Sequence, residues 1–138
     1  MAVVTKSIRL TTKGDTDIVD ITAEVERCVA ESGVSAGIAT VFVPGSTEGV
    51  TTIEYESGAV RDLKEAWERI APQDIHYHHN ARWGDGNGHS HVRAAMLGAS
   101  LTVPFASSEL LLGTWQQVVL LDFDNRSRSR EIIVQIIG

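Results

Sequence analysis

The sequence predicts an α+β fold, with one compact domain, a mostly antiparallel or mixed β-sheet of seven or more strands, and two main helices. The length of 138 residues suits one domain of ordinary size. Two segments repeat their apolar residues with the period of a helix, whereas a larger number of shorter segments alternate or are apolar throughout. Strands and helices do not alternate regularly, which favours α+β over a doubly wound α/β fold. No stretch resembles a linker, so residues 1–138 are taken as a single domain.

The first half of the chain contains both predicted helices. Apolar residues recur at helical spacing in Asp17–Ser32 and again in Gly58–Ile70, which Pro72 ends because proline cannot continue a helix. The strands predicted in this half are rich in β-branched residues, and they are Val3–Thr12, Gly37–Val43 and Gly49–Glu56.

The second half begins with a polar segment, Ile75–His91, that is rich in glycine and histidine. The next segment, Val92–Leu97, fits a helical turn or a strand. The remaining strand candidates are Leu101–Phe105, Leu110–Leu121 and Glu131–Ile137.

Composition and charge exclude several classes of protein. Twelve Lys and Arg against eighteen Asp and Glu give a net charge of −6, which argues against non-specific nucleic-acid binding. No apolar run approaches the roughly 20 residues that span a bilayer, and the N-terminus does not resemble a signal peptide, so we expect a cytoplasmic protein without membrane contact. The single cysteine, Cys28, excludes an intramolecular disulfide and is expected to be buried.

All five histidines lie between His76 and His91. On an extended strand, His-x-His places both rings on one face about 6.6 Å apart, a usual way to offer two ligands to a metal. The glycines at 84, 86 and 88 allow a turn that brings His79 towards His89 and His91. These three histidines therefore predict a divalent metal, zinc before nickel, copper or iron. The alternative is a polar loop with ordinary hydrogen bonds.

A second set of candidates could bind an anion. Arg126, Arg128 and Arg130 alternate along the chain, so on an extended segment they point the same way and could hold a phosphate. The alternative is a solvated loop balanced by nearby aspartates. Arg93 is a further anion candidate, and the turn at residues 45–48 is a weaker one.

Two more groups are possible parts of a site. Glu54 shares a predicted strand face with apolar residues, so it is a general base if that face is buried and a solvated edge carboxylate if it is not. Thr114, Trp115 and Gln116 place polar groups and a large ring within an apolar stretch. We consider them substrate-binding residues, the alternative being that Trp115 belongs to the core.

Long motifs in the second half resemble the YjbQ-like family, whose members are often described as secondary thiamine-phosphate synthases. These motifs are Gly-Asn-Gly-His-Ser-His-Val-Arg-Ala-Ala-Met-Leu-Gly-Ala-Ser-Leu-Thr-Val-Pro from position 86, Leu-Gly-Thr-Trp-Gln-Gln from position 112, and Asp-Phe-Asp from position 122. The resemblance implies an α+β fold, a homotrimer, and a metal or anion near the histidines. It also implies a weak activity that joins hydroxymethylpyrimidine diphosphate to a thiazole phosphate and releases pyrophosphate. His79, His91, Arg93 and residues 113–116 match the family pattern, His89 matches its commoner form, and Glu54 lies where the family usually has a glutamate.

These observations lead to one functional hypothesis and two alternatives. The hypothesis is a metal-assisted transferase that acts on a phosphorylated small molecule. Its catalytic residues would be Glu54, His91 and Arg93, its metal ligands His79, His89 and His91, and its substrate-binding residues Arg93, Thr114, Trp115, Gln116, Arg126, Arg128 and Arg130. The alternatives are a non-catalytic module that binds a metal or a small anion, and a metal-dependent phosphate-ester hydrolase.

Overall fold

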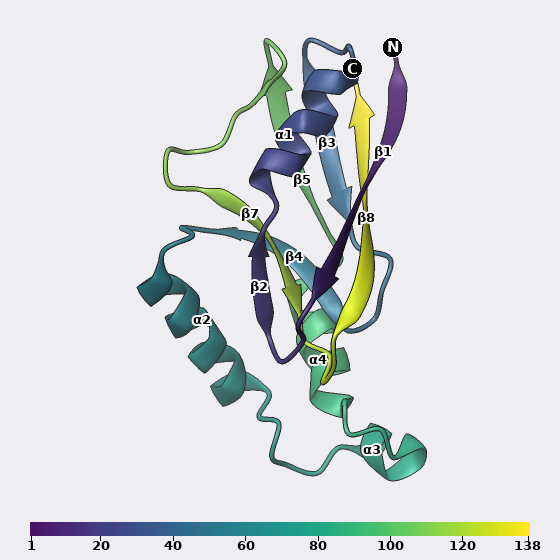
Figure 1. Ribbon diagram of the computed structural model, residues 1–138, viewed down its shortest axis with the longest axis vertical. Helices are drawn as coiled ribbons and strands as arrows, with labels where there is room; N and C mark the ends of the chain where they lie inside the picture. Colours follow the sequence, from purple (N-terminus) through teal and green to yellow (C-terminus); the bar gives the residue numbers. More distant parts are fainter.

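The computed structural model describes residues 1–138 and contains eight strands and four helices (Figure 1). In chain order the elements are β1 (Val3–Thr12), β2 (Asp17–Asp20), α1 (Thr22–Glu31), β3 (Gly37–Phe42), β4 (Glu48–Ile53), α2 (Ser57–Ile70), α3 (His78–Trp83), α4 (Gly88–Leu97), β5 (Ser100–Ala106), β6 (Glu109–Leu110), β7 (Gln117–Asp122) and β8 (Arg128–Ile137). One antiparallel sheet has the strand order β1-β8-β3-β5-β6, and a second has the order β2-β7-β4. The predicted α+β class is therefore confirmed.

Strand β8 follows the alternation expected of a strand with one face in the core. Ile132, Val134 and Ile136 are fully buried, and their neighbours in sequence are only partly so. Because side chains repeat every two residues along a strand, Arg128 and Arg130 lie on the same face as these apolar residues. The start of β8 therefore turns two arginines towards the interior at one end of the sheet.

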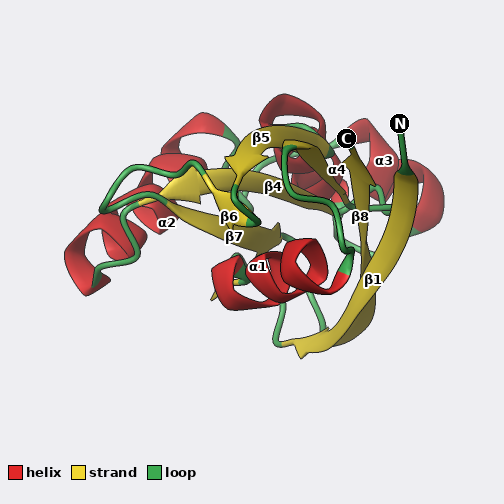
Figure 2. Cartoon of the chain, turned by 90° about the horizontal axis from the view of Figure 1, so that it is seen from above, coloured by secondary structure: helices red, strands yellow, loops and turns green.

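Strand β7 is buried on both of its faces. Val118 and Leu120 belong to the main core together with residues of α1. Val119 and Leu121 belong to a second core with Trp67 of α2 and residues of α4. Figure 2 shows α1 and α4 on opposite sides of β4 and β7. This double burial explains the continuous apolar run before Asp122, because such runs are typical of strands covered on both faces.

Three of the predicted elements have wrong boundaries. Residues 17–20, predicted as the start of a helix, form β2 because their backbone pairs with β7. The predicted strand Leu110–Leu121 is interrupted, and only its ends belong to β6 and β7. The predicted strand Gly49–Glu56 ends at Ile53, so Glu54 lies beyond β4 and is exposed.

The histidine-rich segment is helical, so the extended His-x-His geometry predicted for it is wrong. Helix α3 ends at Trp83 and is followed by Gly84, which adopts a left-handed φ of 72°. The side-chain oxygen of Asn80 accepts a hydrogen bond of 2.8 Å from the backbone N–H of Gly88, which ties the end of α3 to the start of α4. Residues two apart on a helix point to nearly opposite sides, so His89 and His91 diverge.

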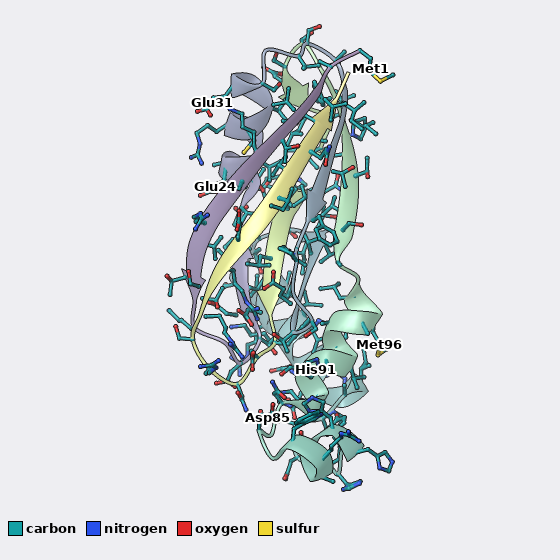
Figure 3. All side chains as sticks on the ribbon, turned by 90° about the vertical axis from the view of Figure 1, so that its right-hand side faces the viewer. Met1, Glu24, Glu31, Asp85, His91 and Met96 are labelled. Atoms are coloured by element: carbon teal, nitrogen blue, oxygen red, sulfur yellow. The ribbon has the colours of Figure 1, made fainter.

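The ends of the chain lie far from this segment. The backbone N–H of Ala2 donates to the carbonyl of Gly138 at 2.6 Å, so the termini meet at one end of the molecule. Figure 3 shows His91 and Asp85 at the opposite end from Met1, where α3, α4 and the start of β8 gather. The four helices include none with the length and apolar character needed to cross a membrane. Cys28 is buried as predicted, and burial raises the pKa of its thiol.

Candidate functional site

The largest cavity, about 540 Å³, opens at this end of the molecule. Its walls come from the loop after β3, from α3 and the loop that follows it, from α4, from the turn between β7 and β8, and from the start of β8. The lining is polar except for one large aromatic ring, that of Trp83. The lining residues are Gly45, Ser46, Thr47, His79, Trp83, Asp85, Asn87, His91, Asp124, Arg128 and Arg130.

Two histidines from neighbouring helices face each other in this cavity. The ring centroids of His79 in α3 and His91 in α4 lie 4.4 Å apart, with 43° between the ring planes. The Oδ1 atom of Asp85 lies 3.5 Å from the Nδ1 atom of His79, which has no hydrogen-bond partner. The pair therefore places two imidazole rings, which can donate or accept a proton, at the cavity wall.

Arg128 is held at the cavity by Asp124. Its Nε and Nη2 atoms lie 2.9 and 2.7 Å from Oδ2 of Asp124, a carboxylate that is completely buried. Burial by itself would raise the pKa of Asp124, but hydrogen bonds from the backbone N–H of Asn125 and from Arg128 and Asn87 hold it below its usual range. The carboxylate thus stays charged and fixes the orientation of the guanidinium group.

Arg130 lies deeper and is shared by two buried carboxylates. Its Nε and Nη2 atoms donate to the two oxygens of Asp122 at 2.7 and 2.9 Å, and Nη2 also donates to Oγ1 of Thr47 at 2.7 Å. The Oε2 atom of Glu48 lies 2.6 Å from Nε. Burial raises the pKa of Glu48, with Arg130 opposing and Asp122 adding to this effect. The base of the cavity therefore has two positive groups for three buried carboxylates.

This arrangement supports two kinds of chemistry. The carboxylates occupy one edge of each guanidinium group, so the groups are oriented in advance and can add an anion at their remaining N–H groups. The two histidines can donate or accept a proton on a ligand in the same cavity. The cavity thus combines anion-binding and proton-transferring side chains from three separate parts of the chain.

The predicted metal ligand His89 lies outside the cavity. It is 1% exposed, and burial followed by the charge of Arg93 lowers its pKa, so the ring is neutral. The structure gathers no group of three or more His, Cys, Asp or Glu side chains that could hold a metal ion. The predicted set of His79, His89 and His91 is therefore not brought together, because the segment is helical, and only His79 and His91 meet.

The predicted catalytic and anion-binding residue Arg93 also lies outside the cavity. It is 3% exposed, and its guanidinium donates to Oε2 of Glu68 at 2.7 Å, to Oγ1 of Thr16 at 2.8 Å and to the backbone oxygen of Ala71 at 3.0 Å. Each of its three nitrogens has a protein partner. Arg93 therefore joins α4, the end of α2 and the turn before β2, which is a structural role.

Replacing Arg93 with methionine is expected to lower the free energy of unfolding by about 2 kcal/mol, because Thr16 and Ala71 lose a buried charged donor. The thermal stabilisation by inorganic phosphate should be the same as in the wild type. Urea denaturation measures the first quantity and thermal unfolding with and without phosphate the second. The matched control is Arg126→Ala, since Arg126 is exposed and should tolerate the change within about 0.5 kcal/mol. Loss of the phosphate effect in the Arg93 variant would contradict the structural assignment.

The remaining predicted site residues lie elsewhere. Glu54, Thr114 and Trp115 line a separate cavity of about 420 Å³ together with Asp20, Tyr55, Glu56 and Gln117. Trp115 is 72% exposed, so the alternative that placed it in the core is wrong. Gln116 donates to Oγ1 of Thr52 at 3.1 Å and lines a third cavity. Of the three alternating arginines only Arg128 and Arg130 line the 540 Å³ cavity, because Arg126 precedes β8.

The sequence pattern did not identify several residues of the 540 Å³ cavity. Asp85 and Trp83 flank Gly84 inside the polar segment, in which only the histidines were predicted to belong to a site. Asp124 belongs to the Asp-Phe-Asp motif and to the aspartates expected to balance the arginines, and Thr47 belongs to the turn that is a weaker anion candidate. Arg128 pairs with Asp124 and Arg130 with Asp122, so the expected balance is found, but both carboxylates are buried rather than solvated. The signal that could have found Asp124 is its spacing from Arg128, since residues four apart in a tight turn readily form an ion pair.

A cavity of about 340 Å³ adjoins the 540 Å³ cavity. The two share Gly45, Ser46 and His91 in their walls. The rest of the wall of the 340 Å³ cavity consists of Glu48 and small residues of α4 and of the segment that follows it. His91 therefore stands where the two spaces meet.

Comparison with known proteins agrees with the resemblance seen in the motifs. The model of the family described as UPF0047 protein YjbQ-like matches residues 6–138. A UPF0047 protein of Archaeoglobus fulgidus is 37% identical over 128 residues, which are 93% of this chain and 97% of that protein. The UPF0047 protein YugU of Bacillus subtilis is 30% identical over 134 residues, 96% of this chain and 98% of its own.

Solved structures share the fold. A crystal structure from Sulfolobus solfataricus, described as a YbjQ-like protein of unknown function, superposes with a TM-score of 0.94 at 33% identity and covers 99% of this chain and 98% of its own. A structure of a yjbq/upf0047 family protein from Clostridium acetobutylicum gives a TM-score of 0.87 at 34% identity, covering 96% and 99% of the two chains. The chain belongs to the YjbQ-like UPF0047 family.

Proposed function

We propose that the 540 Å³ cavity binds a phosphorylated small molecule and that the protein is a transferase of the thiamine-phosphate synthase type. One observation carries the proposal: His79 of α3, His91 of α4, and Arg128 and Arg130 of the distant strand β8 line the same polar cavity. Anion-binding and proton-transferring groups in one cavity are what the displacement of a phosphate or pyrophosphate group requires.

The residues of the chain suggest how such a displacement is assisted. Arg128 and Arg130 bind the diphosphate at the N–H groups that the carboxylates leave free. As pyrophosphate departs, negative charge grows on its oxygens, and the guanidinium groups stabilise this charge. His91, at the junction of the two cavities, donates a proton to the departing group, and the adjoining 340 Å³ cavity provides room for the second substrate.

A divalent cation, zinc before the others, is the cofactor that the two histidines could hold. The fit is partial, since His79 and His91 provide only two ligands, and the Nδ1 atom of His79, which has no hydrogen-bond partner, is buried. Such an ion would neutralise charge on the phosphate. Metal analysis of protein purified without a histidine tag tests this part of the proposal, which predicts metal in the wild type and none after His91→Ala.

In a homotrimer, the separate cavity at Glu54 and Trp115 of one chain could join the 540 Å³ cavity of a neighbouring chain. One chain keeps these residues apart from the histidines, and a subunit interface could bring one chain's Trp115 to its neighbour's histidine segment. Light scattering should then give a mass of about three times 15.0 kDa. Co-refolding His91→Ala with Trp115→Ala chains should restore part of the activity that each lacks alone, whereas sites built within one chain would show no restoration.

The activity itself is tested by pyrophosphate release from hydroxymethylpyrimidine diphosphate and the thiazole phosphate. We expect release only when both substrates are present, together with thermal stabilisation by either substrate alone. Release from the diphosphate without the thiazole would indicate the hydrolase alternative. Stabilisation without release from these or other phosphate esters would indicate the binding module.

A further inference from the structure

Trp83 is the only large hydrophobic residue in the wall of the 540 Å³ cavity, and 66% of it is exposed. Single exposed apolar residues are common on protein surfaces and need no explanation by themselves. This one, however, lines a cavity whose ten other lining residues are polar or glycine. Its position at the C-terminal end of α3, just before the left-handed Gly84, places it beside Asp85 and in the same wall as His79.

The indole ring also has a side-chain contact within α3. The Cζ atom of Arg82 lies over the ring, 5.3 Å from its centroid, a cation–π contact that restricts the orientation of the side chain. A largely exposed aromatic ring that lines the same cavity as two guanidinium groups has the features of a stacking platform. Aromatic rings stack on indole with a preference that aliphatic groups of equal size do not share.

We infer that Trp83 is a specificity-determining residue that stacks on a flat aromatic ring of the ligand, so that the cavity prefers phosphate esters with an aromatic body over aliphatic ones. The inference rests on the proposed function, since Arg128 and Arg130 bind the phosphate of the same ligand. It assigns the two ends of one ligand to two walls of the cavity, the phosphate to the start of β8 and the ring to the end of α3.

Two matched esters test this inference. Benzyl phosphate and cyclohexylmethyl phosphate have the same length and charge, but only the first has an aromatic ring. Calorimetric titration of the wild type should show benzyl phosphate binding about fivefold more tightly. Trp83→Leu should weaken benzyl phosphate by about the same factor and change cyclohexylmethyl phosphate less than twofold, whereas Trp83→Phe should keep most of the preference. Ile70→Ala is the matched control, because Ile70 is 55% exposed and lines none of the cavities.

The possible results separate the two proposals. Equal binding of both esters to the wild type, or equal weakening of both by Trp83→Leu, overturns the role of Trp83 and leaves the phosphate site standing. An unchanged preference in Trp83→Leu, combined with a loss of oligomer mass in light scattering, overturns it as well and assigns Trp83 to a subunit contact. Failure of both esters and of inorganic phosphate to bind contradicts the proposed function, and the stacking role with it.

Discussion

Replacing His91 with alanine is expected to lower kcat/KM for pyrophosphate release by at least about 100-fold, because a positioned proton donor contributes about 10²- to 10⁴-fold. His91 stands where the two cavities meet, and its ring faces that of His79 at 4.4 Å. The side chain is only half-buried, so the free energy of unfolding should change by less than about 1 kcal/mol. Initial rates of pyrophosphate release and urea denaturation measure the two quantities separately.

The matched control is His76→Ala. His76 is exposed before α3, and its ring contacts that of His78 rather than lining the cavity. We expect this variant to keep its rate within about twofold of the wild type. Equal losses in the two variants, or no loss in either, would contradict the assignment of the reaction to the pair of His79 and His91.

Replacing Arg130 with alanine is expected to lower the free energy of unfolding by about 3 to 5 kcal/mol at pH 8, because it leaves buried carboxylates without their charged partner. The side chains of Arg130, Glu48 and Asp122 are 12%, 2% and 0% exposed, so water cannot replace the lost contacts. Urea denaturation should show a lower midpoint with an unchanged m-value. Binding of inorganic phosphate should also be lost.

The pH dependence of this loss follows from Glu48. Burial raises the pKa of its carboxyl in the folded protein, so the folded state binds more protons than the unfolded state as the pH falls. Without Arg130 the carboxyl accepts a proton more readily still, and a neutral carboxyl needs no cation. The difference in stability between wild type and variant should therefore be largest at pH 8 and smaller at pH 5.

Arg128→Ala provides the comparison for this prediction. Arg128 is 33% exposed, and its partner Asp124 keeps hydrogen bonds from Thr47, Asn87 and the backbone N–H of Asn125. The remaining donors should limit the loss of stability to about 1 to 2 kcal/mol. A loss as large as that of Arg130→Ala would mean that shared burial of the carboxylates, rather than the double ion pair of Arg130, determines the effect.

The parts of the fold that the sequence predicted well are those with a long and regular local pattern. The helix predicted over Gly58–Ile70 is α2 to within one residue, and Val3–Thr12 is β1. In both, the more buried residues recur at the spacing of one face, with Trp67 buried in α2 and Ile8 and Thr12 in β1, so the local pattern indicates the secondary structure directly. The expectation that Arg128 and Arg130 point the same way is confirmed, since their alternation continues into the buried face of β8.

The extended geometry predicted for the histidine segment is wrong because the local pattern of this segment is ambiguous. The spacing of His89 and His91 fits one face of a strand, but the residues after them are good helix formers, and α4 begins before His89. The hydrogen bond from Gly88 to Asn80 links residues eight apart through a side chain. Such a contact leaves no trace in the spacing of apolar and polar residues along a short stretch of sequence.

The α+β class, the main strands and helices, the family and the candidate groups of one site follow from local spacing and motifs. Which of these candidates lie together depends on how the segments pack. His79 joins His91, Arg128 and Arg130, while His89 and Arg93 are buried behind them and Glu54 and Trp115 line another cavity. The physical reason is that each of these positions depends on packing between segments far apart in the chain, such as the pairing of Arg130 with Glu48 some 80 residues before it.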